Sequence, residues 1–326
     1  MKFTAGILTA AALTIAAAQT RPSSGDAHPY ATSAPMPEPR LFAPGTISTG
    51  DDESHPAFTP DGRTLYFLKN TPSFDTWTIV TSRFDRGRWT TPEVAPFSGR
   101  FSDADPFITA DGKRFFFIST RPVADAAKED TDIWTMERTD NGWGSPRHVD
   151  GLSSPASEWF PTLTADGTVY FGSGRDGGVG ATDLWRARPS GSGYAPPEHL
   201  GPAINTRAGE FEPYVAPDES YMIFAAIGRP DSFGAYDLYL SRRENGIWMA
   251  PTHLPRPINS DGWDFAPRVS PDGKYLFFAS SRRVDAAPPP APLTYRQLLE
   301  KIHAPGNGLR DIYQVDLSTV LANRHD

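Results

Sequence analysis

A repeated unit of about 50 residues constrains the fold of this chain more than any other feature. Residues 210–259 hold one complete copy: an acid, a proline, a turn between two apolar segments, an Asp-aliphatic-aromatic segment and a closing segment that ends in Ile-Asn. The turn aspartate recurs at intervals of 50 to 55 residues, as Asp61, Asp111, Asp166, Asp218 and Asp272. Strand-rich units with such a period are typical of radial β arrays. The sequence therefore predicts an all-β chain folded as a five-bladed β-propeller.

The first and last repeats predict how the ring closes. Residues 36–49 resemble the last strand of a repeat, since Pro39, Leu41 and Ile47 match the Pro, Leu and Ile that end the later copies. The fifth repeat stops at residue 317 without such a strand. We therefore expect an N-terminal strand to complete the last blade, which leaves no exposed sheet edge. The propeller is expected to span residues 36–317, with a C-terminal tail at residues 318–326.

One insertion breaks the regular layout. Residues 284–308 lie between the second and third strands of the fifth repeat, and within them Leu298, Leu299 and Ile302 have helical spacing after a proline-rich lead. This pattern predicts one short helix over residues 294–303. We expect the insertion on the face where the inner strands begin, either as a lid or docking element or as an ornament packed on the last blade.

The N-terminus has the pattern of a secretion signal. Lys2 precedes an apolar run at residues 5–17, and three alanines end at Ala18. Residues 1–18 are therefore predicted to be a cleaved signal peptide, and the Ser-, Ala- and Pro-rich residues 19–35 a disordered lead-in. The chain has no cysteine, so it has no thiol for a lipid anchor or a disulfide. We expect a periplasmic or secreted protein with no membrane span.

Composition and charge narrow the class of partner. The 33 prolines, 28 glycines and 12% aromatic residues fit a chain of many short strands. The formal net charge of −8 supplies no basic stripe to replace the counterions of nucleic acid, which argues against a nucleic-acid partner. We expect a monomer.

An acid stands three residues before the first-strand proline in every repeat. These acids can form a ring of carboxylates that binds a ligand or a divalent cation such as Ca²⁺ or Mg²⁺. Alternatively, they brace the blades by pairing with recurring arginines, and we favour this interpretation because residues common to all blades hold a ring together. The acids are Glu53, Asp103, Glu158, Glu210 and Asp264, and the arginines are Arg121, Arg175, Arg229 and Arg282.

The residue directly before the proline differs between repeats: His55, Asp105, Phe160, Glu212 and Ala266. Strand alternation is expected to place each on the same side as its upstream acid. Asp105, Glu212 and His55 are therefore the candidate catalytic residues. Paired acids facing one channel can bind a divalent metal or supply an acid and a base for glycoside cleavage. The alternative is a solvated channel lining without chemistry.

Aromatic residues flank the same entry to the channel, at Phe101, Trp159, Phe211, Trp263 and Phe265. Flat apolar walls beside a few acids suit a sugar or peptide ligand, and Trp159 and Trp263 are included among the candidate ligand-binding residues. The alternative role for these rings is packing between blades.

Short motifs recur through the repeats: Ser270-Pro271-Asp272-Gly273 at the turn, Ser119 and Arg121 after the second strand, Asp132-Ile133-Trp134 in the third strand, and LGPAINT at residues 200–206. In these motifs the chain resembles the TolB-type, WD40-like β-propeller repeats of bacterial envelope proteins over roughly its whole mature length. The fourth repeat departs from the pattern, with Glu219 where the turn glycine belongs. The resemblance implies a periplasmic binding or scaffolding role and names no substrate.

Two functions follow from these observations. The first is a binding or scaffolding protein that engages an envelope protein or a glycan at the mouth of the channel. The second is a carbohydrate-active hydrolase or lyase that uses the channel carboxylates, with or without a divalent cation. Two carboxylates about 5 to 9 Å apart in an open pocket favour the enzyme.

Overall fold

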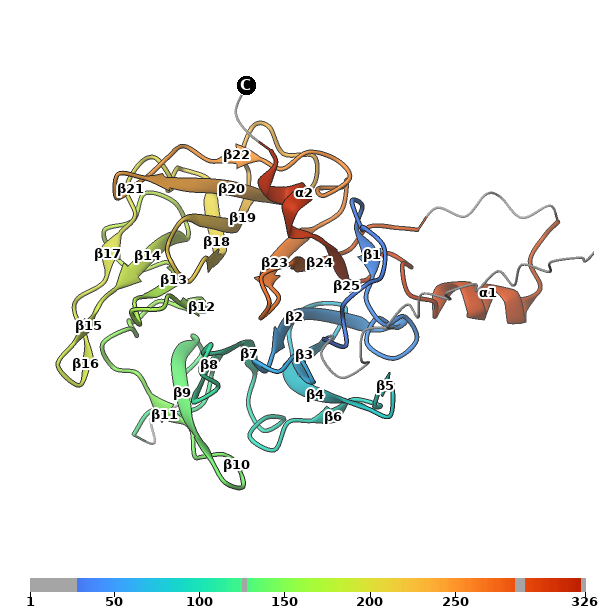
Figure 1. Ribbon diagram of the computed structural model, residues 1–326, viewed down its shortest axis with the longest axis horizontal. Coiled ribbons are helices and arrows are strands. Elements are labelled where there is room, and N and C mark those ends of the chain that lie inside the picture. The colour runs from blue at the N-terminus through green and yellow to red at the C-terminus, as the bar shows by residue number, and fades with distance from the viewer. Residues whose placement is uncertain (1–27, 125–127, 285–290, 324–326) are drawn as a thin grey trace, which may run out of the picture.

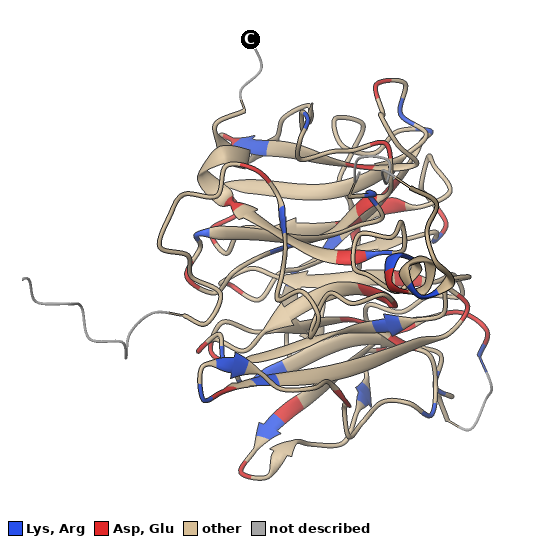
Figure 2. Cartoon of the chain, turned by 90° about the vertical axis from the view of Figure 1, so that its right-hand side faces the viewer, with Lys and Arg blue, Asp and Glu red and all other residues tan. Residues whose placement is uncertain are grey.

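The computed structural model describes residues 28–124, 128–284 and 291–323. Five antiparallel sheets surround a central channel, and Figure 1 shows them as blades around one axis. The predicted five-bladed β-propeller is therefore confirmed. In the side view of Figure 2, basic and acidic positions are interspersed along the blades.

Each blade has four strand positions, counted outward from the channel. The inner strands are β2 (Asp52–Phe58), β7 (Asp103–Ile108), β12 (Glu158–Leu163), β18 (Gly209–Val215) and β23 (Asp264–Val269). The second strands are β3 (Thr64–Asn70), β8 (Arg114–Ser119), β13 (Val169–Ser173), β19 (Tyr221–Ile227) and β24 (Tyr275–Ser280). The third strands are β4 (Trp77–Asp85), β9 (Asp132–Thr139), β14 (Asp183–Ala187), β20 (Tyr236–Glu244) and β25 (Asp311–Asp316).

Short strands form the outer edge of each blade. The fourth positions hold β6 (Glu93–Val94), β11 (Arg147–His148), β17 (Glu198–His199), β22 (Thr252–His253) and β1 (Arg40–Leu41). Two-residue extensions add β5 (Arg88–Trp89), β10 (Gly142–Trp143) and β21 (Ile247–Trp248) to the third strands, while β15 (Pro189–Ser190) and β16 (Gly193–Tyr194) pair with each other.

The ring closes through the N-terminal strand, as the sequence predicts. In β1, Arg40 pairs with Gln314 and Leu41 with Tyr313 of β25, in antiparallel register. The last blade therefore has the order β1-β25-β24-β23, with its outer strand taken from the opposite end of the chain.

The segment before β1 corrects the expected disordered lead-in. Residues 1–27, which include the predicted signal peptide, lie outside the described residues, but His28, Tyr30 and Thr32 contact the propeller, while residues 31–35 are exposed. Tyr30 is buried against Phe58 and Phe277, and its carbonyl accepts a hydrogen bond from Gln314 Nε2 at 2.8 Å. Tyr30 thus anchors the last part of the expected lead-in, and residues 19–27 of it lie outside the described residues.

A recurring turn joins the first and second strands of each blade. In the first blade, Asp61 Oδ1 accepts hydrogen bonds from the Thr59 hydroxyl at 2.6 Å and from the Arg63 N–H at 3.0 Å. The next residue is left-handed, as in Gly62 with φ 67°. Glu219 takes the same conformation in the fourth blade with φ 58°, and its carboxylate contacts Tyr170 and Arg243. These contacts offset the strain of a non-glycine residue at this position.

Every inner strand carries a β-bulge at its proline. In β2, Ser54 pairs with Leu68 and Ala57 with Tyr66, which leaves one extra residue on the inner strand. The residue before the proline is left-handed in all five blades, with φ from 50° to 55°, at His55, Asp105, Phe160, Glu212 and Ala266. A bulge re-aims the side chain and interrupts alternation. Alternation therefore does not hold where the sequence analysis relied on it.

Two short helices complete the fold. The predicted helix is α1 (Tyr295–Ile302), capped by Thr294 and Gln297 in a capping box. No residue of α1 is buried, and Figure 1 shows it projecting beyond β25 at the side of the last blade. The second helix, α2 (Leu317–Leu321), covers the end of β25 with buried Leu317 and Val320.

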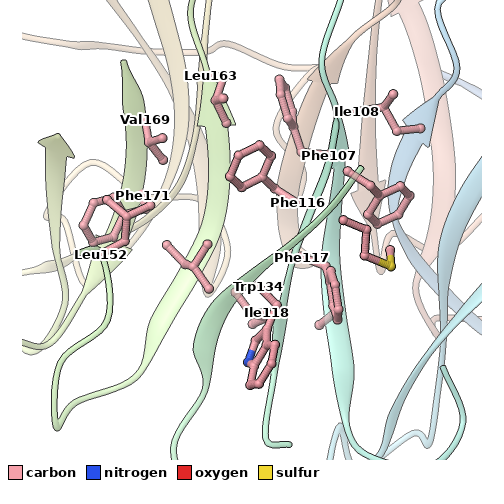
Figure 3. Packing of buried hydrophobic residues seen from close by; sticks show 14 of the residues in the cluster. Phe107, Ile108, Phe116, Phe117, Ile118, Trp134, Leu152, Leu163, Val169 and Phe171 are labelled. Atoms are coloured by element: carbon pink, nitrogen blue, oxygen red, sulfur yellow. The ribbon is translucent and has the colours of Figure 1, made fainter. Parts of the chain in front are cut away.

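The hydrophobic core lies between neighbouring blades. Figure 3 shows one part of it, where Phe107 and Phe116 of the second blade approach Leu163 and Val169 of the third. Blade faces are covered by large apolar side chains on both neighbours, so each inner strand is held rigidly. This rigidity fixes the positions of the residues that line the channel.

Candidate functional site

The five acids at the starts of the inner strands form ion pairs within their own blades, each with a cation at the end of the second strand. Asp103 pairs with Arg121 at 2.6 Å, Glu158 with Arg175 and Glu210 with Arg229 at 2.9 Å, and Asp264 with Arg282 at 2.7 Å. Glu53 pairs with Lys69, a partner that the sequence analysis missed.

The same arginines reach backward to the preceding blade. Arg229 Nη2 donates to the Ile204 carbonyl at 2.7 Å, and Arg121 and Arg282 make equivalent bonds to Phe97 and Ile258. All five acids are fully buried, and none lines the aromatic pocket in the channel that is described below. The structure thus corrects their ligand-binding assignment: they sit in an architectural contact, because each buried carboxylate already has a cationic partner.

Three of the residues before the prolines meet at the centre of the channel. His55 Nε2 lies 3.1 Å from Asp105 Oδ1 and 3.1 Å from Glu212 Oε1, while His55 Nδ1 lies 2.8 Å from Ser54 Oγ. The predicted grouping within each blade, such as Glu53 with His55, is wrong. The bulge turns each of these side chains away from its upstream acid and toward the channel axis, so that the contacts run between blades.

The remaining carboxylate oxygens are also held. Asp105 Oδ2 accepts the Phe160 N–H at 2.7 Å, and Glu212 Oε2 accepts the Ala266 N–H at 2.6 Å. All five residues that precede a proline therefore belong to one hydrogen-bonded layer, which we call the before-proline layer: His55, Asp105, Phe160, Glu212 and Ala266.

Burial and charge set the protonation of this layer. Burial raises the pKa of Asp105 to about 6, with His55 lowering it and Glu212 raising it further. Burial alone lowers the pKa of His55, but the negative charges of Asp105 and Glu212 outweigh burial, and its pKa is raised above the ordinary value. The two carboxylates therefore favour the protonated form of the imidazole.

An aromatic pocket of about 170 Å³ opens above these three residues. Its walls include Trp159, Phe211, Trp263 and Phe265, four of the five aromatic residues expected there. Phe101 is not among them, because it stacks with Arg100 and Arg121 instead.

Three further aromatic residues line this aromatic pocket and were not predicted: Phe74, Trp77 and Tyr236. Trp77 contacts Trp159 with ring centroids 5.8 Å apart, and Tyr236 contacts Trp263 at 5.3 Å. Phe74 belongs to the connection between second and third strands, whereas Trp77 and Tyr236 begin the third strands β4 and β20. The connections between second and third strands lie on the face where the inner strands begin, where the insertion was also expected, and this location could have identified these residues.

The insertion does not cover this pocket. None of the described residues 291–308 is among those that line it, so the lid interpretation finds no support there. Asn307 instead donates to the Gly50 carbonyl at 3.0 Å, which ties the end of the insertion to the loop before β2.

The divalent cation considered from the sequence has no obvious place among the described residues. They contain no group of three or more His, Cys, Asp or Glu side chains arranged to hold a metal ion. In the channel, His55 Nε2 already faces both carboxylates.

No helix in the described ranges is both long and apolar enough to span a membrane.

Comparisons with known proteins identify the fold and not the family. No model of a protein family matches the chain, and no curated protein matches it. A thermostable family-43 glycoside hydrolase of known structure is 12% identical, with 84% of this chain and 92% of that chain covered and a TM-score of 0.50. A family GH62 α-L-arabinofuranosidase from Coprinopsis cinerea is 13% identical over 87% and 95% of the two chains, with a TM-score of 0.44.

A peptidase structure also matches part of the chain. A puromycin-hydrolyzing peptidase from Mycobacterium tuberculosis is 15% identical over 74% of this chain, with a TM-score of 0.42, but this chain spans only 36% of that protein's length. At such identities the likeness shows the propeller fold alone. None of these three structures is a TolB-type protein, so the resemblance of the repeats to that family stays a prediction.

Proposed function

We propose that this propeller is a glycoside hydrolase that acts on one terminal sugar residue held in the aromatic pocket. The observation that carries the proposal is the pair of carboxylates, Asp105 and Glu212, held on one imidazole at the floor of that pocket. The family-43 glycoside hydrolase mentioned above shares the fold over most of both chains, but the proposal rests on the side chains found here.

The size and lining of the aromatic pocket suit one sugar ring. Its 170 Å³ is well below the roughly 300–1,000 Å³ of pockets that hold drug-sized ligands. Seven aromatic residues surround it, and the polar groups on its wall are His55, Asp105 and Glu212. Apolar walls with a few convergent polar groups fix the orientation of a small ligand.

The spacing of the carboxylates favours cleavage with retention. Both inner oxygens lie 3.1 Å from His55 Nε2, so they are separated by at most twice that distance. Retaining glycosidases hold their two carboxyl groups about 5–5.5 Å apart, whereas inverting enzymes need a wider gap for a water molecule. The two acids of this channel are close enough for direct attack by one of them.

The environments of the two acids assign their roles. Asp105 has a pKa raised to about 6 and is 4% exposed, which suits a proton donor. The Glu212 side chain is more exposed, at 14%, and also lines the pocket, which suits a nucleophile. Asp105 protonates the glycosidic oxygen as the bond to the leaving group breaks, and Glu212 bonds to the anomeric carbon. Water then gives a proton to Asp105 and displaces Glu212. His55 positions both acids.

The test is hydrolysis of a panel of 4-nitrophenyl glycosides of pentoses and hexoses in both anomeric forms. The wild-type protein is expected to release nitrophenol from at least one of them. Glu212→Gln and Asp105→Asn are expected to lower kcat/KM by about 10²–10⁴-fold, and Asp140→Asn, an exposed turn residue, serves as the matched control. Full activity in Glu212→Gln would rule out the nucleophile assigned here.

A sugar-binding protein without hydrolytic activity is the second candidate. The observation that favours it is the full occupation of the four carboxylate oxygens by His55 and by two backbone N–H groups. Binding is measured by quenching of the fluorescence of Trp77, Trp159 and Trp263 on addition of sugars. Binding without turnover by the wild-type protein selects this candidate, and neither binding nor turnover overturns both.

We further propose that the protein works in the cell envelope as a monomer, with a protein-linked or free glycan as its partner. The proposal rests on the N-terminal pattern around Lys2 and Ala18 and on the resemblance to TolB-type repeats. Fractionation of cells that express the full chain tests it, with N-terminal sequencing of the product. Recovery in the cytoplasm with residues 1–18 intact contradicts it.

A further inference from the structure

The opposite end of the channel holds a second, larger hollow. This turn-face pocket has a volume of about 540 Å³ and is lined by the strand ends and turns of all five blades, for example Pro60, Asp111, Gly167, Pro217 and Pro271. It shares no lining residue with the aromatic pocket. A volume in this range accommodates a small organic ligand.

Arg268 lies in the wall of this turn-face pocket as a buried cation without a counter-ion. It is 5% exposed, and it forms no ion pair with any residue that the structure describes. Nη1 donates to Thr162 Oγ1 at 2.8 Å and Nη2 to the Pro106 carbonyl at 3.2 Å, both neutral acceptors, while Nε has no partner in the described chain. Burial lowers its pKa to about 10, which leaves it charged at neutral pH.

The channel acids do not neutralise Arg268 by contact. Against the lowering by burial, the charges of Asp105 and Glu212 raise the pKa of Arg268, but neither acid forms an ion pair with it in the described chain. Phe160 packs against both Arg268 and His55: its ring centroid lies 4.0 Å from Arg268 Cζ and 5.8 Å from the ring centroid of His55. Phe160 is fully buried and belongs to neither pocket lining. Asp105 and Glu212 place their oxygens on His55 and on backbone N–H groups. A buried charge with only neutral hydrogen-bond partners is costly, and an anion in the pocket removes that cost.

We propose that the turn-face pocket binds a small oxyanion, a carboxylate or a phosphate group, at the guanidinium of Arg268, with Arg114 as a second cation at the pocket wall. A guanidinium N–H to an oxyanion is among the stronger hydrogen bonds in proteins. Asp111 and Asp166 also line the pocket, but both are exposed and accept hydrogen bonds from their own turns, so water and salt screen their charges.

Titration of the full-length protein with sodium phosphate and with sodium acetate tests the proposal, against sodium chloride at equal ionic strength. Isothermal calorimetry is expected to detect saturable binding of at least one oxyanion. Arg268→Gln is expected to weaken this binding by about tenfold or more, and Arg268→Lys to retain part of it. Arg296→Gln, on exposed α1, is the matched control. Binding of phosphate alone or acetate alone distinguishes the two sources of the oxyanion.

A second measurement keeps the proposal open to refutation if Arg268→Gln does not fold. In the wild-type protein, the side-chain Nε–H signal of Arg268 is followed by NMR as phosphate or acetate is added. A saturable shift of this signal is expected, together with little change in the Nε–H signal of exposed Arg296. No saturable heat and no shift with either anion would overturn the proposal, and so would unchanged affinity in a folded Arg268→Gln protein.

Discussion

The two ends of the channel are built from the same repeat, yet they carry opposite chemistry. At the aromatic end, two acids share one imidazole under a wall of rings. At the turn end, two arginines, the buried Arg268 and Arg114, line a wider hollow. Both differences arise beside the inner-strand proline. The residue before each proline belongs to the before-proline layer. The residues that directly follow the prolines form a second set, which is Ala57, Phe107, Thr162, Tyr214 and Arg268. The repeated residues build the ring, and the ones that vary give each end its chemistry.

Removal of the partition between the two ends is expected to have the largest effect. Phe160→Ala deletes a fully buried ring and should lower the free energy of unfolding by about 3–5 kcal/mol. It should also weaken phosphate binding, because Arg268 can then approach Asp105 or Glu212. Phe171→Ala, an equally buried ring between blades, is the control: it should lose similar stability in chemical denaturation and keep its phosphate affinity. If both variants bind phosphate equally, Phe160 does not separate the two ends.

The two ends should also differ in their response to pH. The pKa of Asp105 is raised to about 6, so the folded state binds this proton more tightly than the unfolded chain does. Its contribution to the free energy of unfolding is therefore complete below about pH 4 and lost as pH rises through about 6. The raised pKa of His55 also stabilises the folded state at low pH, and this contribution to the free energy of unfolding is lost at higher pH than that of Asp105. Arg268, with a pKa of about 10, does not titrate in this window.

Chemical denaturation from pH 4 to pH 8 measures this difference. The wild-type protein should lose about 1–3 kcal/mol relative to Asp105→Asn as pH rises through the window. Turn aspartates such as Asp61 and Asp111 have lowered pKa values and act with the opposite sign, but they are present in both proteins and cancel in the comparison. Parallel pH profiles for the two proteins would show that Asp105 does not carry the effect.

The smallest effect is expected at the rim of the aromatic pocket. Trp263 is 39% exposed, so Trp263→Ala should change the free energy of unfolding by less than about 1 kcal/mol. It should weaken sugar binding by up to about tenfold, since a stacked aromatic pair contributes about 0.5–1.5 kcal/mol. Phosphate affinity at the turn end should not change, and calorimetry with each ligand separates the two. An equal loss at both ends would mean that the substitution disturbs the whole ring.

The sequence predicted the ring well because the ring is made of repeated positions. The turn aspartates indicated the number of blades, and Pro39 and Leu41 identified the closing strand. His55, Asp105 and Glu212 stood out because they differ between otherwise equal repeats. Their partners were predicted wrongly, because a bulge is invisible to an argument from strand alternation.

Other features escaped for local reasons. Arg268 varies between repeats as clearly as Glu212 does, but it lies one residue beyond the proline, and that position was not compared. Trp77 was not singled out as a site residue, because each third strand has an aromatic residue and the place of Trp77 at the pocket depends on the path of the preceding loop. Tyr30 was hidden by the polar composition around it.

The closing strand has a consequence for how the molecule is made. Residues 40 and 41 emerge from the ribosome early, but their partners at Gln314 and Tyr313 are among the last to appear. Until synthesis is nearly complete, the first four blades form an open arc with a free edge at either side. The slowest contact to form therefore joins the two ends of the polypeptide, and a chain cut short anywhere before β25 keeps that arc open and prone to pairing with other chains.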